Sequence, residues 1–200
     1  SFYTASLSDK NFVIAFEASP KTSEDFNKNL NLNNFKNIIL KNLAVSDKDN
    51  KKVIFNESFN DWESSLSHNK FKEKSLTTIN TITIDTALKE YDLSEYFLFI
   101  KLDIEGHEFK AIQGATNIIK KYKPIIIIEF SKYIFENNEN SINFLKDFLI
   151  DFDYCIYGTN NKQFNINDIM SLLKGLDTKH KTIGNYYLIK NDDETKNFFK

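Results

Sequence analysis

The chain is poor in cysteine, and this shortage excludes two kinds of cross-link. Cys155 is the only cysteine among the 200 residues, so neither a disulfide within the chain nor a zinc cluster built from cysteines can form. Its neighbours Tyr154, Ile156 and Tyr157 form an apolar pattern. We therefore predict a buried structural thiol at this position rather than a nucleophile.

Strong net charge and long apolar runs are also missing. The formal net charge is −2, which gives no reason to expect binding to nucleic acid or to an anionic membrane. No apolar run approaches the roughly 20 residues of a membrane span, and no signal peptide is visible. With 41% hydrophobic and 27% charged residues, the chain has the composition of a globular domain with a sizeable core. We expect one cytoplasmic domain over residues 1–200.

Candidate functional residues are most concentrated between Tyr96 and Glu108, in the stretch YFLFIKLDIEGHE. It opens with an apolar run, 96–100, that is typical of a strand covered on both faces. Lys101, Asp103 and Glu105 then occupy every second position. Because alternate side chains of an extended strand share a face, we expect these three charged groups to point the same way.

We expect Gly106 to end this strand and a helix, 109–121, to follow it. Carboxylates at the C-terminal end of a buried strand mark the place where an open α/β sheet builds its active site. The alternative is an ordinary strand end with a solvated acidic turn. We favour a functional site, because charged groups this close to a buried strand are costly unless something uses or pairs them.

The other apolar patterns alternate between strand and helix. Predicted strands cover 11–16, 37–45, 52–55, 77–84, 125–130, 153–157 and 185–189, and predicted helices cover 1–7, 23–32, 86–91, 141–152 and 167–173. This alternation indicates the α/β class, with a mostly parallel sheet covered on both faces and a late hairpin pair.

Two further carboxylates stand at the ends of predicted strands. Glu17 ends the first strand, where an acidic side chain is a natural partner for paired sugar hydroxyls. It can equally belong to an N-cap network, in which Ser19 caps the following helix. Glu129 would place a second carboxylate on the same rim of the sheet as Asp103.

Six short motifs, in this order, resemble the FkbM family of methyltransferases. The resemblance runs from residue 1 to about 190, and order and spacing together carry it. The motifs are FEASP at 16–20, LAVSD at 43–47, TITID at 81–85, IKLDIEGHE at 100–108, the pair Gly114-Ala115 and KPIIIIEF at 123–130.

The resemblance implies a Rossmann-like class I methyltransferase fold, a three-layer sandwich whose sheet is parallel apart from one late strand. It also implies S-adenosylmethionine as the cofactor. By the family's pattern, Glu17 would bind the ribose hydroxyls, and Ala18 would lie against the adenine. Ser46 and Asp47 match the region that lines the adenine. Asp103 matches a position near the methionine end of the cofactor and near the methyl acceptor.

The family's first strand and glycine-rich loop should precede the opening residues SFYT, and they do not. In the family's fold, that strand lies between the strands expected at 11–16 and 97–102, whose inner edges would otherwise be unpaired. We therefore expect these 200 residues to be the C-terminal part of a longer chain. The alternative is a sheet that closes differently and leaves the cofactor site incomplete.

The reaction implied is methyl transfer to a hydroxyl of a sugar, a glycan or another small secondary-metabolite-type molecule. The protein must place oxygen and methyl close together and remove the hydroxyl proton. Asp103, Glu105 and His107 are the candidates for this base, and Lys101 would pair with a carboxylate and keep it ionised.

Surrounding segments supply the expected walls of the methyl-acceptor site. These are the polar, irregular segment 56–74, which is typical of a lid or binding loop, and the segment 134–140. Trp62 would act either as an aromatic platform or as the packing anchor of its own loop.

Asp85 is expected to cap the helix 86–91.

Four alternatives stay open. Carboxylates suit hard cations, so Mg²⁺ could be held by Asp103, Glu105 and Glu129, although we expect no metal. A Rossmann protein for a nucleotide sugar or nicotinamide would suit Glu17, but the chain has no G-x-G-x-x-G and would leave 100–108 without a role. A methyltransferase fold without its cofactor loop could serve as a binding or scaffold module. The protein could also form a homo-oligomer.

Overall fold

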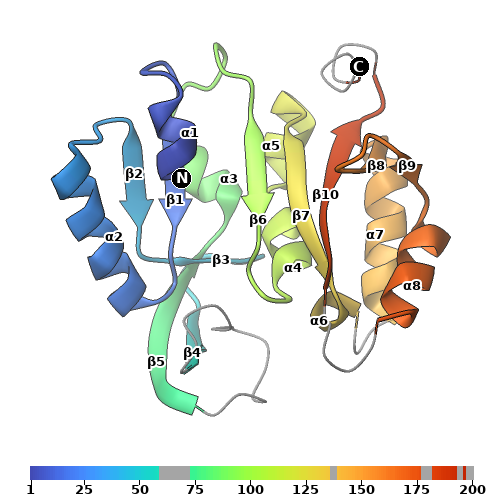
Figure 1. Cartoon of the computed structure of the whole chain (residues 1–200), viewed down its shortest axis with the longest axis horizontal. Helices are drawn as coiled ribbons and strands as arrows, with labels where there is room; N and C mark the ends of the chain where they lie inside the picture. The colour runs from blue at the N-terminus through green and yellow to red at the C-terminus, as the bar shows by residue number, and fades with distance from the viewer. Residues whose placement is uncertain (59–72, 136–138, 177–181, 193–195, 197–200) are drawn as a thin grey trace. The chain divides into compact units, whose positions relative to one another are not determined.

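The computed structural model describes residues 1–58, 73–135, 139–176, 182–192 and 196 (Figure 1). Trp62 and most of the segment 56–74 lie outside these residues, as does 136–138 of the second expected wall. The chain divides into two compact units, Ser1–Ile82 and Thr83–Lys200. Each unit is described by itself, and the single domain expected over 1–200 stays a prediction. In the part of the chain described, no helix is long and apolar enough to cross a membrane.

The first unit contains two small sheets. In one, β1 (Val13–Phe16) pairs in parallel with β2 (Ile38–Lys41), and the helices α1 (Phe2–Ser6) and α2 (Pro20–Asn33) belong to the same part of the chain. In the other, β5 (Glu73–Ile82) pairs in parallel with β3 (Ala44–Val45) and antiparallel with β4 (Lys52–Ser58). Ala44, Phe55 and Ile79 form the buried cluster of the second sheet.

The continuous strand expected over 37–45 is wrong, because the chain leaves the first sheet after Lys41 and enters the second at Ala44. Asn42 lies at the break. Its side-chain amide donates to the carbonyl oxygens of Glu17 (2.7 Å) and Ala18 (3.3 Å). The turn is thereby tied to the segment that follows β1, which a period-two apolar pattern does not reveal.

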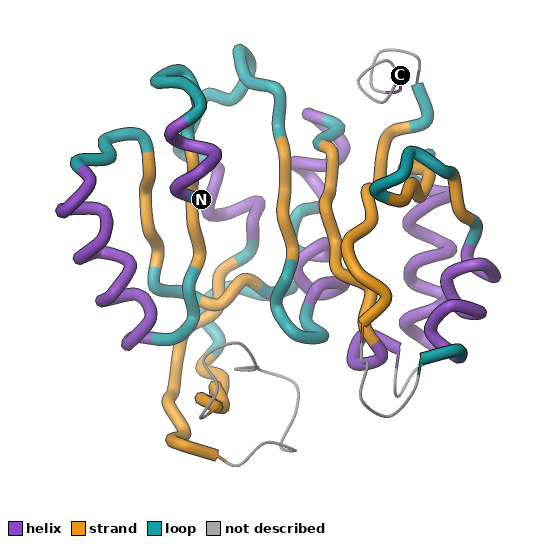
Figure 2. The backbone as a smooth tube through the Cα atoms, in the orientation of Figure 1, coloured by secondary structure: helices purple, strands orange, loops and turns teal. Residues whose placement is uncertain are grey.

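The second unit is built on one five-stranded sheet in the order β6-β7-β10-β8-β9. Its strands are β6 (Phe99–Leu102), β7 (Ile125–Ser131), β8 (Tyr154–Gly158), β9 (Gln163–Phe164) and β10 (Thr182–Lys190). β6 and β7 are parallel, whereas β10 runs antiparallel to both β7 and β8, as the arrows in Figure 1 show; Figure 2 draws the same strands in orange. The carboxyl ends of β6, β7 and β8 therefore share one rim with the start of β10.

This topology does not confirm the expected mostly parallel sheet. The described residues form three parallel and four antiparallel ladders: the five-stranded and three-stranded sheets are mixed, whereas the β1-β2 sheet is parallel. The expected late antiparallel strand is present, because β10 lies between β7 and β8 and runs antiparallel to both. The two late strands, β8 and β10, pair antiparallel as expected, and β9 and the helix α8 (Ile166–Lys174) lie between them along the chain.

β6 also differs from its expected form. The apolar run 96–100 is only partly strand, and Phe97 and Phe99 are 44% and 59% exposed, so the expectation of a strand covered on both faces is wrong. Among the described residues, β6 pairs only with β7 and β1 pairs only with β2. The buried centre of the second unit is instead β7, where Ile126, Ile128 and Phe130 have no exposed surface.

One helix of the second unit differs clearly from its expected form. The single helix expected over 109–121 is two helices, α4 (Glu108–Gln113) and α5 (Thr116–Tyr122), separated at Gly114-Ala115. The short helix α6 (Lys132–Phe135) was not predicted, and α7 (Glu139–Asp151) contacts β8. Because β6 ends at Leu102 and α4 begins at Glu108, the loop between them covers 103–107.

Asp85 does not cap the helix that was expected to follow it. Thr83 caps α3 (Ile84–Leu88), because its hydroxyl accepts from Thr86 N at 3.1 Å. The Asp85 carboxylate instead accepts from the backbone of Asn117 (3.0 Å) and Ile118 (2.9 Å) at the start of α5. It also accepts from the Asn117 side chain at 2.9 Å. Asp85 thus joins α3 to the start of α5.

Replacing Asp85 with Ala should lower the free energy of unfolding by about 2 kcal/mol, because three hydrogen bonds at a helix N-terminus are lost. Urea denaturation followed by circular dichroism measures this. Asp147→Ala, at an exposed position of α7, is the control and should change the free energy of unfolding by less than about 0.5 kcal/mol. Equal effects of the two substitutions would contradict the assigned role.

Candidate active site

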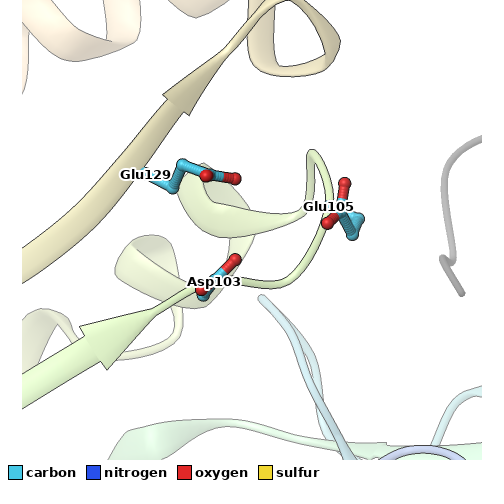
Figure 3. A group of neighbouring side chains, drawn as sticks. All are labelled: Asp103, Glu105 and Glu129. Atoms are coloured by element: carbon cyan, nitrogen blue, oxygen red, sulfur yellow. The ribbon is translucent and has the colours of Figure 1, made fainter. Parts of the chain in front are cut away.

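Three carboxylates meet on the rim of the second unit. Asp103 follows β6, Glu129 lies near the end of the adjacent strand β7, and Glu105 lies on the loop after β6 (Figure 3). One oxygen from each side chain lies within 4.8 Å of an oxygen from the other two. Negative groups this close repel one another, so the group favours binding a proton or a cation.

Lys101 is the cation beside this group. Its Nζ donates to Asp103 Oδ2 at 2.9 Å and to Asn185 Oδ1 at 3.0 Å. Both members of the ion pair are about half exposed, so the pair contributes little to stability. Its effect is geometric, because Lys101 connects β6 and β10 across the intervening strand β7.

The loop after β6 brings Glu105 to the other two carboxylates through a turn. The spacing of charged residues at every second position did not predict this turn. The strand ends at Leu102 rather than at Gly106, and Glu105 and Gly106 have φ values of 54° and 96°. A left-handed conformation is uncommon for a residue other than glycine. The shared face expected for Lys101, Asp103 and Glu105 is therefore wrong in detail, although the turn still brings Glu105 near Asp103.

His107 does not join the carboxylates. It is 7% exposed, occupies the residue before α4, and makes no side-chain capping bond. The described His, Cys, Asp and Glu groups that could hold one ion together comprise Asp103, Glu105 and Glu129, without His107. Its burial in the loop makes it a weaker candidate base than the three carboxylates.

Glu108, the first residue of α4, is the residue that sequence reasoning missed. It is only 1% exposed, and its Oε1 accepts from Ile104 N at 2.9 Å. Its Oε2 is buried without a hydrogen-bond partner among the described residues. The pKa of Glu108 is raised to about 7, mainly by burial; the backbone N–H groups of the loop oppose this shift, and the Asp103 charge adds to it. A glutamate in a helix's first turn is common in any protein, so only its position in GHE distinguished it.

Glu129 is less buried than Glu108. Burial raises its pKa, as does the Asp103 charge, while a hydrogen bond with Thr182 and the Lys101 charge act in the opposite direction. Asn185 of β10 lies directly opposite Glu129 in the antiparallel ladder. Directly opposed residues project from the same face of a sheet, so Glu129 and Asn185 are neighbours on the face that carries the carboxylates.

In the first unit, Glu17 follows β1 and is half-buried. Its Oε1 accepts from Ser19 N at 2.8 Å, and the Ser19 hydroxyl in turn accepts from Thr22 N at 3.2 Å. Burial raises the pKa of Glu17, and the Ser19 and Ala18 N–H groups lower it. The N-cap network considered for Glu17 is therefore present, and it fixes one carboxylate oxygen.

The other residues expected to bind the cofactor also lie in the first unit. Ala18 packs against the cluster of Ala44, Phe55 and Ile79. Ser46 is buried just after β3, and its hydroxyl donates to Asp47 Oδ1 at 3.0 Å. Ser46 N also donates to the carbonyl oxygen of Ile82 at 2.9 Å. These contacts hold the loop after β3 in a defined conformation.

Cys155 is partly buried on β8, and burial raises the pKa of its thiol. A raised pKa leaves less of the reactive thiolate at neutral pH. Cys155 is thus only partly buried rather than buried as predicted, and its structural role stays a prediction.

Comparison with known proteins identifies a family. The family model described as Methyltransferase FkbM domain matches residues 1–157, which is more than half of the chain. No curated protein matches. A crystal structure named methyltransferase FkbM from Methylobacillus flagellatus KT is 20% identical, with a TM-score of 0.49, over 89% of this chain and 36% of that one. This chain thus spans about a third of that protein. On the family match, the chain belongs to the FkbM methyltransferase domain family.

Proposed function

We propose that the chain is an S-adenosylmethionine-dependent O-methyltransferase whose methyl acceptor is a hydroxyl of a sugar, a glycan or a related small molecule. The observation that carries the proposal is the group of Asp103, Glu105 and Glu129, with oxygens within 4.8 Å, on one rim of a sheet in a member of this family. Hydroxyl methylation needs a group that removes a proton, and carboxylates can do so.

The residues that follow β1 and β3 fit the cofactor's nucleoside half in their chemistry. Glu17 can accept from paired ribose hydroxyls, and its bond from Ser19 N holds the carboxylate in one orientation. Ala18 is small enough to leave room for a flat ring, and Ser46 and Asp47 offer polar atoms in a fixed loop. When bound, S-adenosylmethionine supplies a methyl group activated by a positively charged sulfur.

The carboxylates on the rim of the sheet would remove the hydroxyl proton of the acceptor. Asp103 is the proposed base, with Lys101 holding its position through the 2.9 Å contact. Glu105 and Glu129 are the alternatives, and the raised pKa of Glu129 moves that group toward neutral pH, where acid–base groups work best. His107, which lies outside the group, is the least favoured of the expected bases.

Glu17→Gln should weaken the binding of S-adenosylhomocysteine about 10- to 100-fold, since hydrogen bonds to a charged group contribute roughly 1.5–3 kcal/mol. The amide keeps an oxygen for Ser19 N, so the helix cap survives. Calorimetric titration measures the affinity. Glu24→Gln, at an exposed position of α2, should leave it unchanged, and unchanged affinity in Glu17→Gln would remove Glu17 from the cofactor site.

The proposed activity is tested by incubating the chain with S-adenosylmethionine carrying a labelled methyl group and a panel of hydroxyl compounds. Label in an acceptor, with formation of S-adenosylhomocysteine, is expected. The absence of both would favour the binding or scaffold module. Adding a chelator distinguishes the Mg²⁺ alternative: transfer should be unchanged, whereas a loss reversed by Mg²⁺ would assign the three carboxylates to a metal.

A further inference from the structure

The loop of residues 103–107 joins β6 to α4 and carries two of the three carboxylates, Asp103 and Glu105 (Figure 3). We call it the carboxylate loop. Two successive residues in it, Glu105 and Gly106, have φ values of 54° and 96°. A left-handed conformation at a residue other than glycine is unfavourable and persists only where surrounding contacts maintain it. We therefore looked for a neighbouring group that holds the carboxylate loop in place.

Glu108 is such a group. It follows the carboxylate loop directly, and its Oε1 accepts from Ile104 N at 2.9 Å. Ile104 lies between Asp103 and Glu105 in the sequence, so this hydrogen bond fixes the backbone that carries both carboxylates. Burial raises the pKa of Glu108, and the Asp103 charge raises it as well, which agrees with a Glu108 side chain close to that carboxylate.

The helix that carries Glu108 is packed firmly into the second unit. Phe109 and Ile112 of this helix are buried, and the ring centre of Phe109 lies 5.1 Å from that of Phe144 on α7. Side chains in a close-packed interior have little room to move. The Glu108 carboxylate is therefore attached to a rigid base, and its bond to Ile104 N ties the carboxylate loop to that base.

Stability alone gives little reason for a glutamate at this position. The side chain of Glu108 is 1% exposed, and its Oε2 meets no hydrogen-bond partner in the part of the chain that the structure describes. Burying a carboxylate and leaving one of its oxygens unpaired are both unfavourable. Departures of this kind from stable packing are expected at functional sites. The position of Glu108 next to the carboxylate loop thus indicates a role in the reaction rather than in folding alone.

We propose that Glu108 is a positioning residue for methyl transfer: its hydrogen bond to Ile104 N keeps the carboxylate loop in the conformation that brings Asp103 and Glu105 beside Glu129. In this role it acts through the carboxylates rather than on the cofactor or the methyl acceptor directly. This inference rests on the proposed function, to which it adds a residue that determines the geometry of the site. The role requires the acceptor oxygen of Glu108 and not its charge.

Three substitutions separate the acceptor oxygen from the charge and from the volume of the side chain. Glu108→Gln keeps an acceptor oxygen and removes the charge. Glu108→Met has a similar volume, but its sulfur is only a weak acceptor. Glu108→Asp keeps the charge and withdraws the carboxylate by one methylene group. Gln113→Met, at an exposed position of the same helix, is the control.

The rate is measured with labelled S-adenosylmethionine and the hydroxyl compound of the panel that accepts most label. Glu108→Met and Glu108→Asp should each lower kcat at least about tenfold, because a misplacement of about 1 Å can reduce a rate about 10²-fold. The KM for S-adenosylmethionine should change less than about threefold, since a contact that serves only the transition state leaves binding unchanged. Glu108→Gln and Gln113→Met should stay within about twofold of the original kcat.

The position of the carboxylate loop is followed separately by NMR of the ¹⁵N-labelled chains. The Ile104 amide should exchange with solvent faster in Glu108→Met than in Glu108→Gln or in the original chain, because an amide that loses its hydrogen-bond partner opens more readily. Circular dichroism checks that each variant folds. Should Glu108→Met not fold, Glu108→Asp carries the comparison with Glu108→Gln.

The inference is overturned if Glu108→Met and Glu108→Asp leave kcat unchanged, or if the Ile104 amide exchanges equally fast in all variants. It is also overturned if Glu108→Gln loses as much activity as Glu108→Met, which would assign the role to the charge. If the original chain transfers no label to any compound, the proposed function is rejected, and this inference with it. Transfer by the original chain that the substitutions leave unchanged rejects the inference alone.

Discussion

Replacing Asp103 with Ala is expected to reduce methyl transfer at least 100-fold while the chain stays folded, since a positioned general base typically contributes about 10²- to 10⁴-fold. The side chain is about half exposed and its ion pair with Lys101 is a surface pair, so its loss should change the free energy of unfolding by less than about 1 kcal/mol. The rate is followed by release of S-adenosylhomocysteine, and folding by circular dichroism.

Matched substitutions decide which carboxylate is the base. Glu105→Gln and Glu129→Gln are compared with Asp103→Asn, because each keeps the shape of the side chain and removes the charge. Asp25→Asn serves as a control, since Asp25 is an exposed carboxylate paired with Lys28 at 2.7 Å in the first unit. Retained activity in Asp103→Ala would exclude Asp103 as the base, and loss in only one of the other two variants would transfer the role to that residue.

Replacing Glu108 with Gln is expected to remove a large part of the pH dependence of stability. The pKa of Glu108 in the folded chain is about 7, against an ordinary value of 4.5. Between these values the folded chain binds more protons than the unfolded chain. The stabilisation is thus fully present below about pH 4.5 and is lost as the pH rises through 7, by about 3 kcal/mol. Gln cannot ionise, so Glu108→Gln should be more stable than the original chain at pH 8 and similar to it at pH 4.5.

Urea denaturation of both chains at pH 4.5 and at pH 8 measures this effect. Other carboxylates with raised pKa, Glu17 and Glu129 among them, contribute equally to both chains and cancel in the difference. The control is Glu24→Gln, which should follow the original chain at each pH. The assignment fails if Glu108→Gln loses as much stability between pH 4.5 and pH 8 as the original chain does.

The local patterns predicted most elements, because apolar periodicity reflects burial directly. The segments 125–130 and 141–152 are strand and helix as expected, within a residue or two at each end. What the patterns could not predict are contacts between distant residues. Asn42 divides an apolar run by bonding to the carbonyl oxygens of Glu17 and Ala18. Asp85 caps a helix 32 residues away rather than the one beside it.

In the candidate site, too, local patterns predicted some residues, whereas others depend on contacts between distant parts of the chain. Asp103 and Glu129 were expected on one rim, because the carboxyl ends of parallel strands lie together, and β6 and β7 are parallel. The position of Glu105 depends on a left-handed turn, which a glutamate gives no reason to expect. The role of Glu108 depends on complete burial beneath that turn, and Asn185 enters only because β10 lies beside β7. Strand order is set by long-range pairing, which a single sequence specifies weakly.

The central claim, that this chain is a methyltransferase that uses S-adenosylmethionine, is tested most directly by calorimetric titration of S-adenosylhomocysteine. The titration is made into the 200-residue chain and into a version that carries whatever sequence its gene encodes upstream. The account predicts saturable binding with micromolar affinity by at least one of the two, weakened in each binding version by Glu17→Gln. Binding by neither version, with both folded, would contradict the claim and favour a methyltransferase fold that serves as a binding module.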